Sequence, residues 1–265
     1  MKIYDKIITI KKQELSKLKR ILGVSTLKRS LIRHNRLRKP IKSIYIISRV
    51  KGKYRLRTHR RIYYDKSFNE SPSQAEIKEG NIKVSLDVKK VYYDTSYCNE
   101  RLLFTKLLSN RKEKNKVTID VLYGGIGILG FHLIRIPEVL SCRVVDYNPH
   151  CTEWFFKSLE KQPKRYIPKI QFIESSITTH LLTKVKEEED KTKKIAVCIA
   201  PLNKIPLKKI LKNYDQVFYY LLLDNVEVEG YLSQFNSNKI GKVSFRKVKE
   251  YCKGSAIYLI NIDKK

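Results

Sequence analysis

The stretch "VTIDVLYGGIGILGFHLIRIPEVLSCRVVDYNPH", residues 117–150, decides the fold class of this chain. It passes from an apolar strand-like segment through a glycine cluster and an apolar helix-like segment to a second strand-like segment ending in Asp-Tyr-Asn-Pro. Gly124, Gly125 and Gly127 directly follow the first segment, which predicts a tight turn where backbone N–H groups approach an anionic ligand beside a helix N-terminus. The stretch therefore predicts a unit that binds a nucleotide-like molecule.

Asp146 narrows the class of ligand. It ends the second strand-like segment, roughly 20 residues beyond the glycines, where a carboxylate can accept hydrogen bonds from both hydroxyls of a ribose. A dinucleotide and S-adenosylmethionine both fit this arrangement, and a glycine turn that only serves packing is the structural alternative. The Asn-Pro that follows the acid favours S-adenosylmethionine.

The pattern around this stretch predicts an α/β fold with a Rossmann-like, mostly parallel sheet. Strand-like segments alternate with helix-like ones and lie at residues 116–123, 142–147, 169–175, 195–201 and 216–225. Such alternation places ligands at the carboxyl ends of the strands. Residues 242–251 and 256–263 predict a terminal antiparallel pair.

The periodicity changes near residue 100, which predicts a domain boundary. Upstream, residues 43–50 read as a strand, and residues 70–93 read as a hairpin built around a Glu-Gly-Asn turn. We therefore expect a small basic α+β domain over residues 1–98 and the α/β domain over residues 99–265.

Charge points to a polyanionic partner. The chain has 56 Lys and Arg against 26 Asp and Glu, a formal charge of +30. Residues 1–66 hold 22 of these cations but only Asp5, Glu14 and Asp65 as acids, and tyrosines recur among them. This mixture suits RNA phosphates and unstacked bases. General basic drift of a lysine-rich sequence is the alternative.

Other compositional features predict a soluble intracellular protein, cytoplasmic by default, with a mitochondrial or nuclear address left open. The five cysteines are scattered without a Cys-x-x-Cys pair, which predicts reduced thiols and no zinc site. No apolar run reaches the roughly 20 residues of a membrane span. The pattern gives no oligomeric state.

Three segments together resemble the tRNA guanine-37 methyltransferases and their sister family, the wybutosine-synthesis aminocarboxypropyl transferases. They are "EIKEGNIKVSLDVKKVYYDTSYCNER" (76–101), "VLYGGIG" (121–127) and "VVDYNPH" (144–150). The upstream segment matches the family pattern at Glu79, Gly80, Asn81, Asp87, Lys90, Val91, Tyr92, Glu100 and Arg101. The resemblance implies a class I methyltransferase fold, S-adenosylmethionine as cofactor, the anticodon region of tRNA as partner, and neither a metal nor a membrane.

The resemblance also implies roles for individual residues. Glu100 would be the general base, Arg55 would hold the target base or a phosphate, and Pro201 would complete the catalytic set. The cofactor would contact Tyr123, Gly124, Gly125, Gly127, Asp146, Tyr147 and Glu174. The alternatives are that Glu100 is an ordinary first-turn glutamate, Arg55 one of many phosphate contacts, and Glu174 a solvated acid. On these expectations residues 1–98 bind RNA and residues 99–265 hold the cofactor and catalyse.

Departures from the methyltransferase pattern favour the aminocarboxypropyl branch. Ile199-Ala200-Pro201 stands where the methyltransferases have Asn-Leu-Pro, and residues 94–97 replace their Ser-Pro-Arg-Leu. Asn225-Val226-Glu227 matches the sister branch. Asp120 lies one residue further from the glycines than the family acid. Methyl transfer is the first alternative, an inactive RNA-binding protein the second, and a dinucleotide-dependent enzyme the third.

Overall fold

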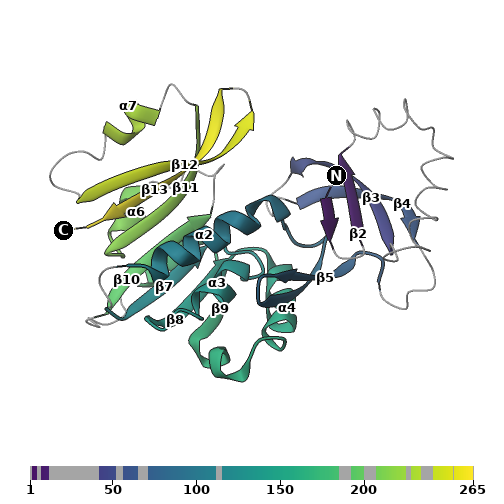
Figure 1. Ribbon diagram of the computed structural model, residues 1–265, viewed down its shortest axis with the longest axis horizontal. Helices are drawn as coiled ribbons and strands as arrows, with labels where there is room; N and C mark the ends of the chain where they lie inside the picture. The colour runs from purple at the N-terminus through teal and green to yellow at the C-terminus, as the bar shows by residue number, and fades with distance from the viewer. Residues whose placement is uncertain are drawn as a thin grey trace. The chain divides into compact units, whose positions relative to one another are not determined.

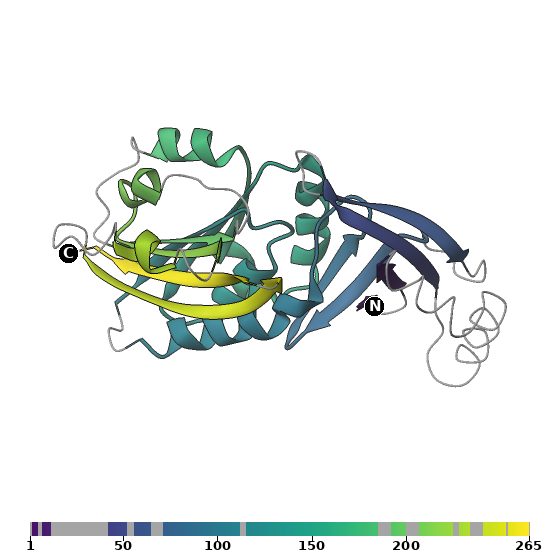
Figure 2. The ribbon, with the colours of Figure 1, turned by 90° about the horizontal axis from the view of Figure 1, so that it is seen from above.

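The computed structural model describes residues 2–4, 7–11, 42–51, 56–64, 71–111, 115–184, 192–199, 207–224, 228–233, 241–252 and 254–264 (Figures 1 and 2). The chain divides into two compact units. The first comprises Met1–Cys98 with Glu153–Lys161, and the second comprises Asn99–Thr152 with Gln162–Lys265. Arg55 and Pro201 lie outside the described residues.

The first unit contains a four-stranded sheet of order β1-β2-β3-β4. Its strands are β1 (Lys2–Tyr4), β2 (Ile7–Lys11), β3 (Ser43–Lys51) and β4 (Leu56–Tyr64). β2 and β3 pair in parallel, and the two outer pairs are antiparallel. Ile44, Tyr45 and Ile47 of β3 are buried, so the strand that the sequence predicts at residues 43–50 is confirmed and carries part of the core.

A hairpin of β5 (Gln74–Glu79) and β6 (Ile82–Asp87) follows in the same unit. Glu79 pairs with Ile82, so Gly80 and Asn81 form the two-residue turn. Gly80 has φ +59°, a left-handed conformation that glycine adopts without steric cost. Alternate residues of β5 are buried, which is the period of a strand with one face packed. The predicted hairpin is confirmed.

The described residues of the second unit form a seven-stranded sheet of order β12-β13-β11-β10-β7-β8-β9. The neighbouring strands β9, β8, β7, β10 and β11 all pair in parallel. β13 pairs antiparallel with β11, and β12 pairs antiparallel with β13. Their bounds are β7 Val117–Leu122, β8 Val139–Asp146, β9 Ile170–Glu174, β10 Lys193–Ile199, β11 Gln216–Asp224, β12 Lys242–Cys252 and β13 Ser255–Asp263. The predicted Rossmann-like sheet and its terminal antiparallel pair are confirmed.

The order of the strands defines where a ligand binds. From β7 the chain adds β8 and β9 on one side, then crosses to the other side of β7 for β10 and β11. This reversal makes a topological switch point between β7 and β10, and open α/β sheets bind ligands at the carboxyl ends of the strands there. The glycine turn follows β7 directly, so it lies at this point.

Helices lie on both faces of the sheet (Figure 2). On one face, Phe104 of α2 packs edge-on against Phe218 and Tyr220 of β11, at centroid distances of 5.0 and 6.2 Å. On the other, α5, α6 and α7 join an apolar cluster with Tyr219 and its neighbours on β11. The helices among the described residues are α2 Cys98–Ser109, α3 Ile128–Leu133, α4 Pro149–Leu159, α5 Ile177–Lys184, α6 Leu207–Leu211 and α7 Val228–Ser233, with 3₁₀ turns at Thr95–Tyr97 and Lys164–Lys169. No helix in the described part of the chain is long and apolar enough to cross a bilayer.

Candidate cofactor and catalytic site

The glycine turn after β7 has the conformation that its sequence predicts. Tyr123, Gly125 and Gly127 have φ values of +57°, +57° and +83°, in the left-handed region where a side chain is strained. Gly124 is required for a different reason, which is packing. A Cβ at Gly124 would lie 2.6 Å from Val144 Cγ1, so a larger residue would push β7 and β8 apart.

The glycine N–H groups donate hydrogen bonds within the protein. Gly124 donates to the Val145 carbonyl at 3.1 Å, and Gly127 donates to the Gly124 carbonyl at 3.0 Å. Gly125 donates to Asp146 Oδ2 at 2.8 Å. The sequence predicted that these N–H groups approach the ligand. In this structure they shape the turn and hold the acid that follows β8, and their approach to a ligand stays a prediction.

Asp146 is fixed from two sides. Its Oδ2 accepts the Gly125 N–H, and its Oδ1 accepts the Asn148 N–H at 2.9 Å. A carboxylate oxygen can accept more than one hydrogen bond, so both oxygens can still bind hydroxyl groups. The carboxylate at the end of β8 is therefore oriented in advance for a vicinal diol such as that of ribose.

Two further predicted cofactor residues neighbour Asp146. Glu174, the last residue of β9, pairs with Asp146 in the sheet register and accepts a hydrogen bond from Thr152 Oγ1 at 2.6 Å. Tyr147 follows Asp146 and is 40% exposed, which leaves its ring accessible to an aromatic base. An aromatic ring and two carboxylates at adjacent strand ends suit an adenosine, whose ribose and amino group donate hydrogen bonds.

Cys151 lies beside these acids and was not singled out by the sequence. Its side chain is buried. Burial raises the pKa of the Cys151 thiol well above its ordinary value, and the negative charges of Asp146 and Glu174 raise it further. The thiol stays protonated and acts as an apolar filler under the site.

Glu100 lies in the first turn of α2 and is buried. Tyr220 of β11 donates its hydroxyl to Glu100 Oε1 at 2.8 Å, and Arg246 of β12 donates to the same oxygen at 2.5 Å. Burial raises the pKa of Tyr220 far above that of a free phenol, and the Glu100 carboxylate adds to the effect, so Tyr220 remains a donor. Glu100 is thus a first-turn glutamate of α2 that is buried and accepts hydrogen bonds from two distant side chains, and its role as a base stays a prediction.

The sheet register places Glu100 at the same edge as the glycine turn. Leu122, the last residue of β7, pairs with Cys198 of β10, and the next residue of β10, Ile199, pairs with Tyr220. Tyr220 therefore lies level with Tyr123, which opens the turn. Because only β10 separates the two strands, Tyr220 is about 10 Å from the turn, two strand spacings away. A nucleoside with an attached amino-acid moiety can span that distance.

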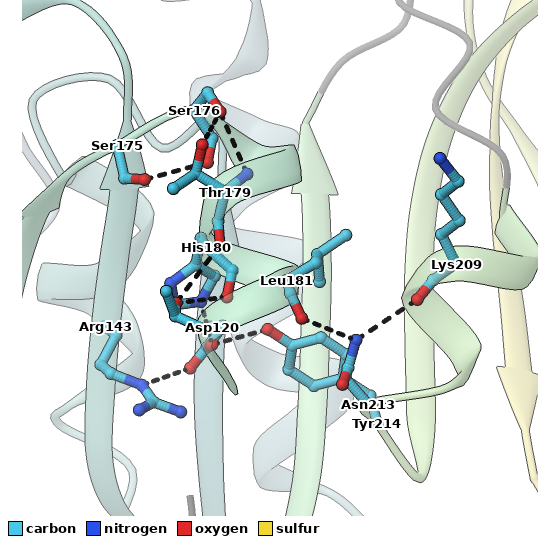
Figure 3. A network of polar contacts seen from close by, with 11 residues as sticks. Asp120, Arg143, Ser175, Ser176, Thr179, His180, Leu181, Lys209, Asn213 and Tyr214 are labelled. Atoms are coloured by element: carbon cyan, nitrogen blue, oxygen red, sulfur yellow. Dashed lines mark hydrogen bonds and ion pairs between the residues drawn. The ribbon is translucent and has the colours of Figure 1, made fainter. Parts of the chain in front are cut away.

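Asp120 belongs to a buried polar network (Figure 3). Its carboxylate accepts hydrogen bonds from Arg143 Nε at 2.9 Å and Tyr214 Oη at 2.6 Å, and lies 2.8 Å from His180 Nε2. Ser176 caps the N-terminus of α5 by accepting the Thr179 N–H, which fixes the helix that carries His180. Asp120 therefore balances the charge of Arg143 and bonds the buried polar side chains of Tyr214 and His180 inside the second unit. The sequence predicted none of these three partners.

In the first unit, the acids of the upstream segment bind neighbouring groups. Asp87 accepts hydrogen bonds from Ser73 Oγ and the Lys89 N–H, both at 2.9 Å. Glu79 accepts one from Tyr93 Oη at 3.1 Å. These contacts brace the hairpin and the loop after it. The structure thus brings the glycines, Asp146, Tyr147, Glu174 and Glu100 to one edge of the second unit's sheet, while Arg55 and Pro201 stay predictions.

The described residues contain no group of three or more His, Cys, Asp or Glu side chains arranged to hold a metal ion. Ile199 ends β10, so an apolar residue occupies the strand end where the methyltransferase pattern has an amide. The stretch 225–227 lies outside the described residues.

No protein-family model and no curated sequence matches this chain at a significant level. Solved structures match it closely in fold. A complex of aTrm5 with tRNALeu superposes with a TM-score of 0.68 at 19% identity, covering 99% of this chain and 71% of the other. The Methanocaldococcus jannaschii tRNA m1G37 methyltransferase gives a TM-score of 0.63 at 19% identity over 88% of this chain and 66% of the other.

A structure of TYW2 from M. jannaschii in complex with AdoMet gives a TM-score of 0.56 at 14% identity. The match covers 85% of this chain and 94% of that one. At these identities the likeness establishes a shared fold. The resemblance that the three sequence segments carry is thus confirmed at the level of the fold, which this chain shares with the aTrm5, tRNA m1G37 methyltransferase and TYW2 structures.

Proposed function

We propose that this chain is an S-adenosylmethionine-dependent transferase that modifies the guanosine-derived purine at position 37 of tRNA, beside the anticodon. The hydrogen bond between Gly125 and Asp146 at the switch point of the sheet carries the proposal. It orients a ribose-binding carboxylate where this fold binds ligands. The buried Glu100 lies at the same edge and supplies a group that can accept a proton.

The residues at this edge fit S-adenosylmethionine. Asp146 would accept the ribose hydroxyls, Tyr147 would cover the adenine, and Glu174 would accept the adenine amino group. Tyr123 and the glycine turn would lie against the methionine part. The TYW2 structure of the same fold contains AdoMet, which supports this choice of cofactor over a dinucleotide.

The residues divide the chemistry between orientation and proton transfer. S-adenosylmethionine, when bound, supplies an electrophilic carbon attached to a positively charged sulfur. Glu100 takes the proton that the purine loses as its ring atom bonds to that carbon, and a base placed within hydrogen-bond reach contributes about 10²–10⁴-fold to such a step. Arg55, which would hold the target base or a phosphate, and Pro201 complete the proposed catalytic set.

The charge distribution supports tRNA as the substrate. A formal charge of +30, with 22 cations in residues 1–66, provides many phosphate contacts. The same fold binds tRNALeu in the aTrm5 complex. We assign RNA binding mainly to residues 1–98 and cofactor binding and catalysis to residues 99–265.

Within this reaction class we favour aminocarboxypropyl transfer. Ile199 ends β10 where the methyltransferases have an asparagine, and isoleucine neither donates nor accepts a hydrogen bond to a base. Methyl transfer is the second candidate, because the tRNA m1G37 methyltransferase superposes more closely than TYW2, with TM-scores of 0.63 and 0.56.

Mass spectrometry of tRNA tests the proposal. The protein and S-adenosylmethionine are incubated with an unmodified transcript and, in parallel, with tRNA that carries the tricyclic wybutosine precursor. We expect one aminocarboxypropyl group on the precursor alone, and none with Glu100→Gln. One methyl group on the transcript guanosine would establish the second candidate. If neither tRNA gains a group and calorimetry detects no binding of S-adenosylmethionine, the proposed enzymatic function is refuted and an RNA-binding protein is favoured.

A further inference from the structure

We infer that Tyr220 and Arg246 are positioning residues for Glu100, which hold one carboxylate oxygen so that the other is left to take the substrate proton. This inference rests on the proposed function and deepens it. Its starting point is the geometry of the two hydrogen bonds, since Tyr220 Oη and Arg246 Nη2 both donate to Oε1. Within the part of the chain that the structure describes, Oε2 receives no hydrogen bond.

Three separate elements meet at this carboxylate. Glu100 comes from the first turn of α2, Tyr220 from β11 and Arg246 from β12. In the sheet, β13 lies between β11 and β12, so the two donors reach the carboxylate from strands that are not neighbours. Two donors from different directions fix both the position and the rotation of a carboxylate far better than one would.

Exposure differs between the two charged members of the trio. The Glu100 side chain is 9% exposed, whereas the Arg246 side chain is 38% exposed, so the pair opens to solvent on the arginine side. A buried acid requires partners in any case, and a purely structural pair would satisfy that need. In a purely structural pair, Oε2 takes no proton from the substrate. Measurements of kcat, made beside measurements of stability, distinguish this role from the proposed one.

The purine ring atom forms a bond to the transferred carbon, the carbon–sulfur bond breaks, and its electron pair goes to sulfur, which becomes a neutral thioether. The proton displaced from the purine goes to Glu100 Oε2. Tyr220 and Arg246 keep their protons and hold Oε1 throughout. After the step, Oε2 releases its proton to water.

Variants of the two donors test the inference in the tRNA assay. Arg246→Gln replaces the guanidinium with a shorter, neutral amide, and Tyr220→Phe removes the hydroxyl. Each weakens the hold on Oε1, and we expect kcat to fall about 10–100-fold because a misplaced base loses most of its effect. The KM for tRNA and the calorimetric Kd for S-adenosylmethionine should stay within about twofold of wild type. Arg246→Lys keeps a cationic donor and should recover part of kcat. Lys242→Gln removes an exposed cation from the same strand and should leave kcat unchanged.

The outcomes separate the inference from the proposed function. If wild type transfers a group but Arg246→Gln and Tyr220→Phe keep its kcat, the positioning role is refuted and the proposed function stands. A matched loss of S-adenosylmethionine affinity or thermal stability in both variants would likewise mark the trio as structural. If wild type binds S-adenosylmethionine but modifies neither tRNA, both proposals fail.

Discussion

The backbone N–H of Gly125 lies 2.8 Å from Asp146 Oδ2, and this contact joins the ends of β7 and β8, 21 residues apart in the chain. It couples a turn that requires a left-handed residue to the acid proposed to bind ribose. A second hydrogen bond, from the Asn148 N–H, closes the other side of the carboxylate. The backbone thus orients Asp146 before any ligand arrives, which lowers the entropy cost of binding.

Asp146→Asn should weaken binding of S-adenosylmethionine by about 10–100-fold, because hydrogen bonds to a charged acceptor are worth about 1.5–3 kcal/mol. The amide keeps the size of the side chain but replaces one acceptor oxygen with a donor. Calorimetry on the free protein measures the change without tRNA. Glu229→Gln is the control, since it removes an exposed acid from α7 in the same unit. Equal affinities for wild type and Asp146→Asn would show that ribose binds elsewhere.

Gly124→Ala should destabilise the second unit, whereas Gly230→Ala should not. The alanine Cβ at position 124 would lie 2.6 Å from Val144 Cγ1 and 3.0 Å from the Val121 carbonyl oxygen, and overpacking of this kind costs about 1–3 kcal/mol. At Gly230 in α7 a Cβ meets nothing within 4 Å, so the change should be neutral or raise stability by up to about 1 kcal/mol. Urea unfolding compares the two free energies. A loss at position 230 equal to that at 124 would contradict the packing argument.

Asp120→Asn should lower the free energy of unfolding by about 3–5 kcal/mol, because it breaks a buried ion pair and leaves Arg143 without its counter-charge. Tyr214→Phe removes one hydrogen bond to the same carboxylate and should cost about 1–2 kcal/mol. Urea unfolding measures both variants, and the exposed Glu229→Gln again serves as the control. If Asp120→Asn unfolds like wild type while its S-adenosylmethionine affinity collapses, Asp120 belongs to the cofactor site instead of the core.

Local pattern was sufficient to predict the sheet, the glycine turn and Asp146. The strands of a parallel sheet are buried on both faces, so β7, β8 and β11 read as apolar runs. The turn needs glycine for a local reason, a left-handed φ at Gly125 and Gly127. Each of these features depends on residues that lie close together in the sequence.

The partners of Glu100 and Asp120 could not be predicted, because they come from distant parts of the chain. Tyr220 and Arg246 are 120 and 146 residues from Glu100, and Tyr214 is 94 residues from Asp120. No spacing rule links residues that meet only when α2 packs on the sheet or α5 packs on the opposite face. From the sequence, Tyr220 inside the apolar run of β11 is predicted to be a core residue. The structure shows that its hydroxyl also donates a hydrogen bond to Glu100.

The protein should lose stability as the pH rises through about 9, where free thiols are about half ionised. Burial raises the pKa of the Cys142 thiol far above its ordinary value of 9.0, and burial with the Asp120 carboxylate raises the pKa of Tyr214 above its ordinary 10.0. The unfolded chain loses these protons at the ordinary values while the folded chain keeps them, so the folded state binds more protons and the free energy of unfolding falls with rising pH. Urea unfolding between about pH 8 and 11 measures the slope. Cys142→Ala should make the slope shallower, and an unchanged slope would show that the thiol ionises equally in both states.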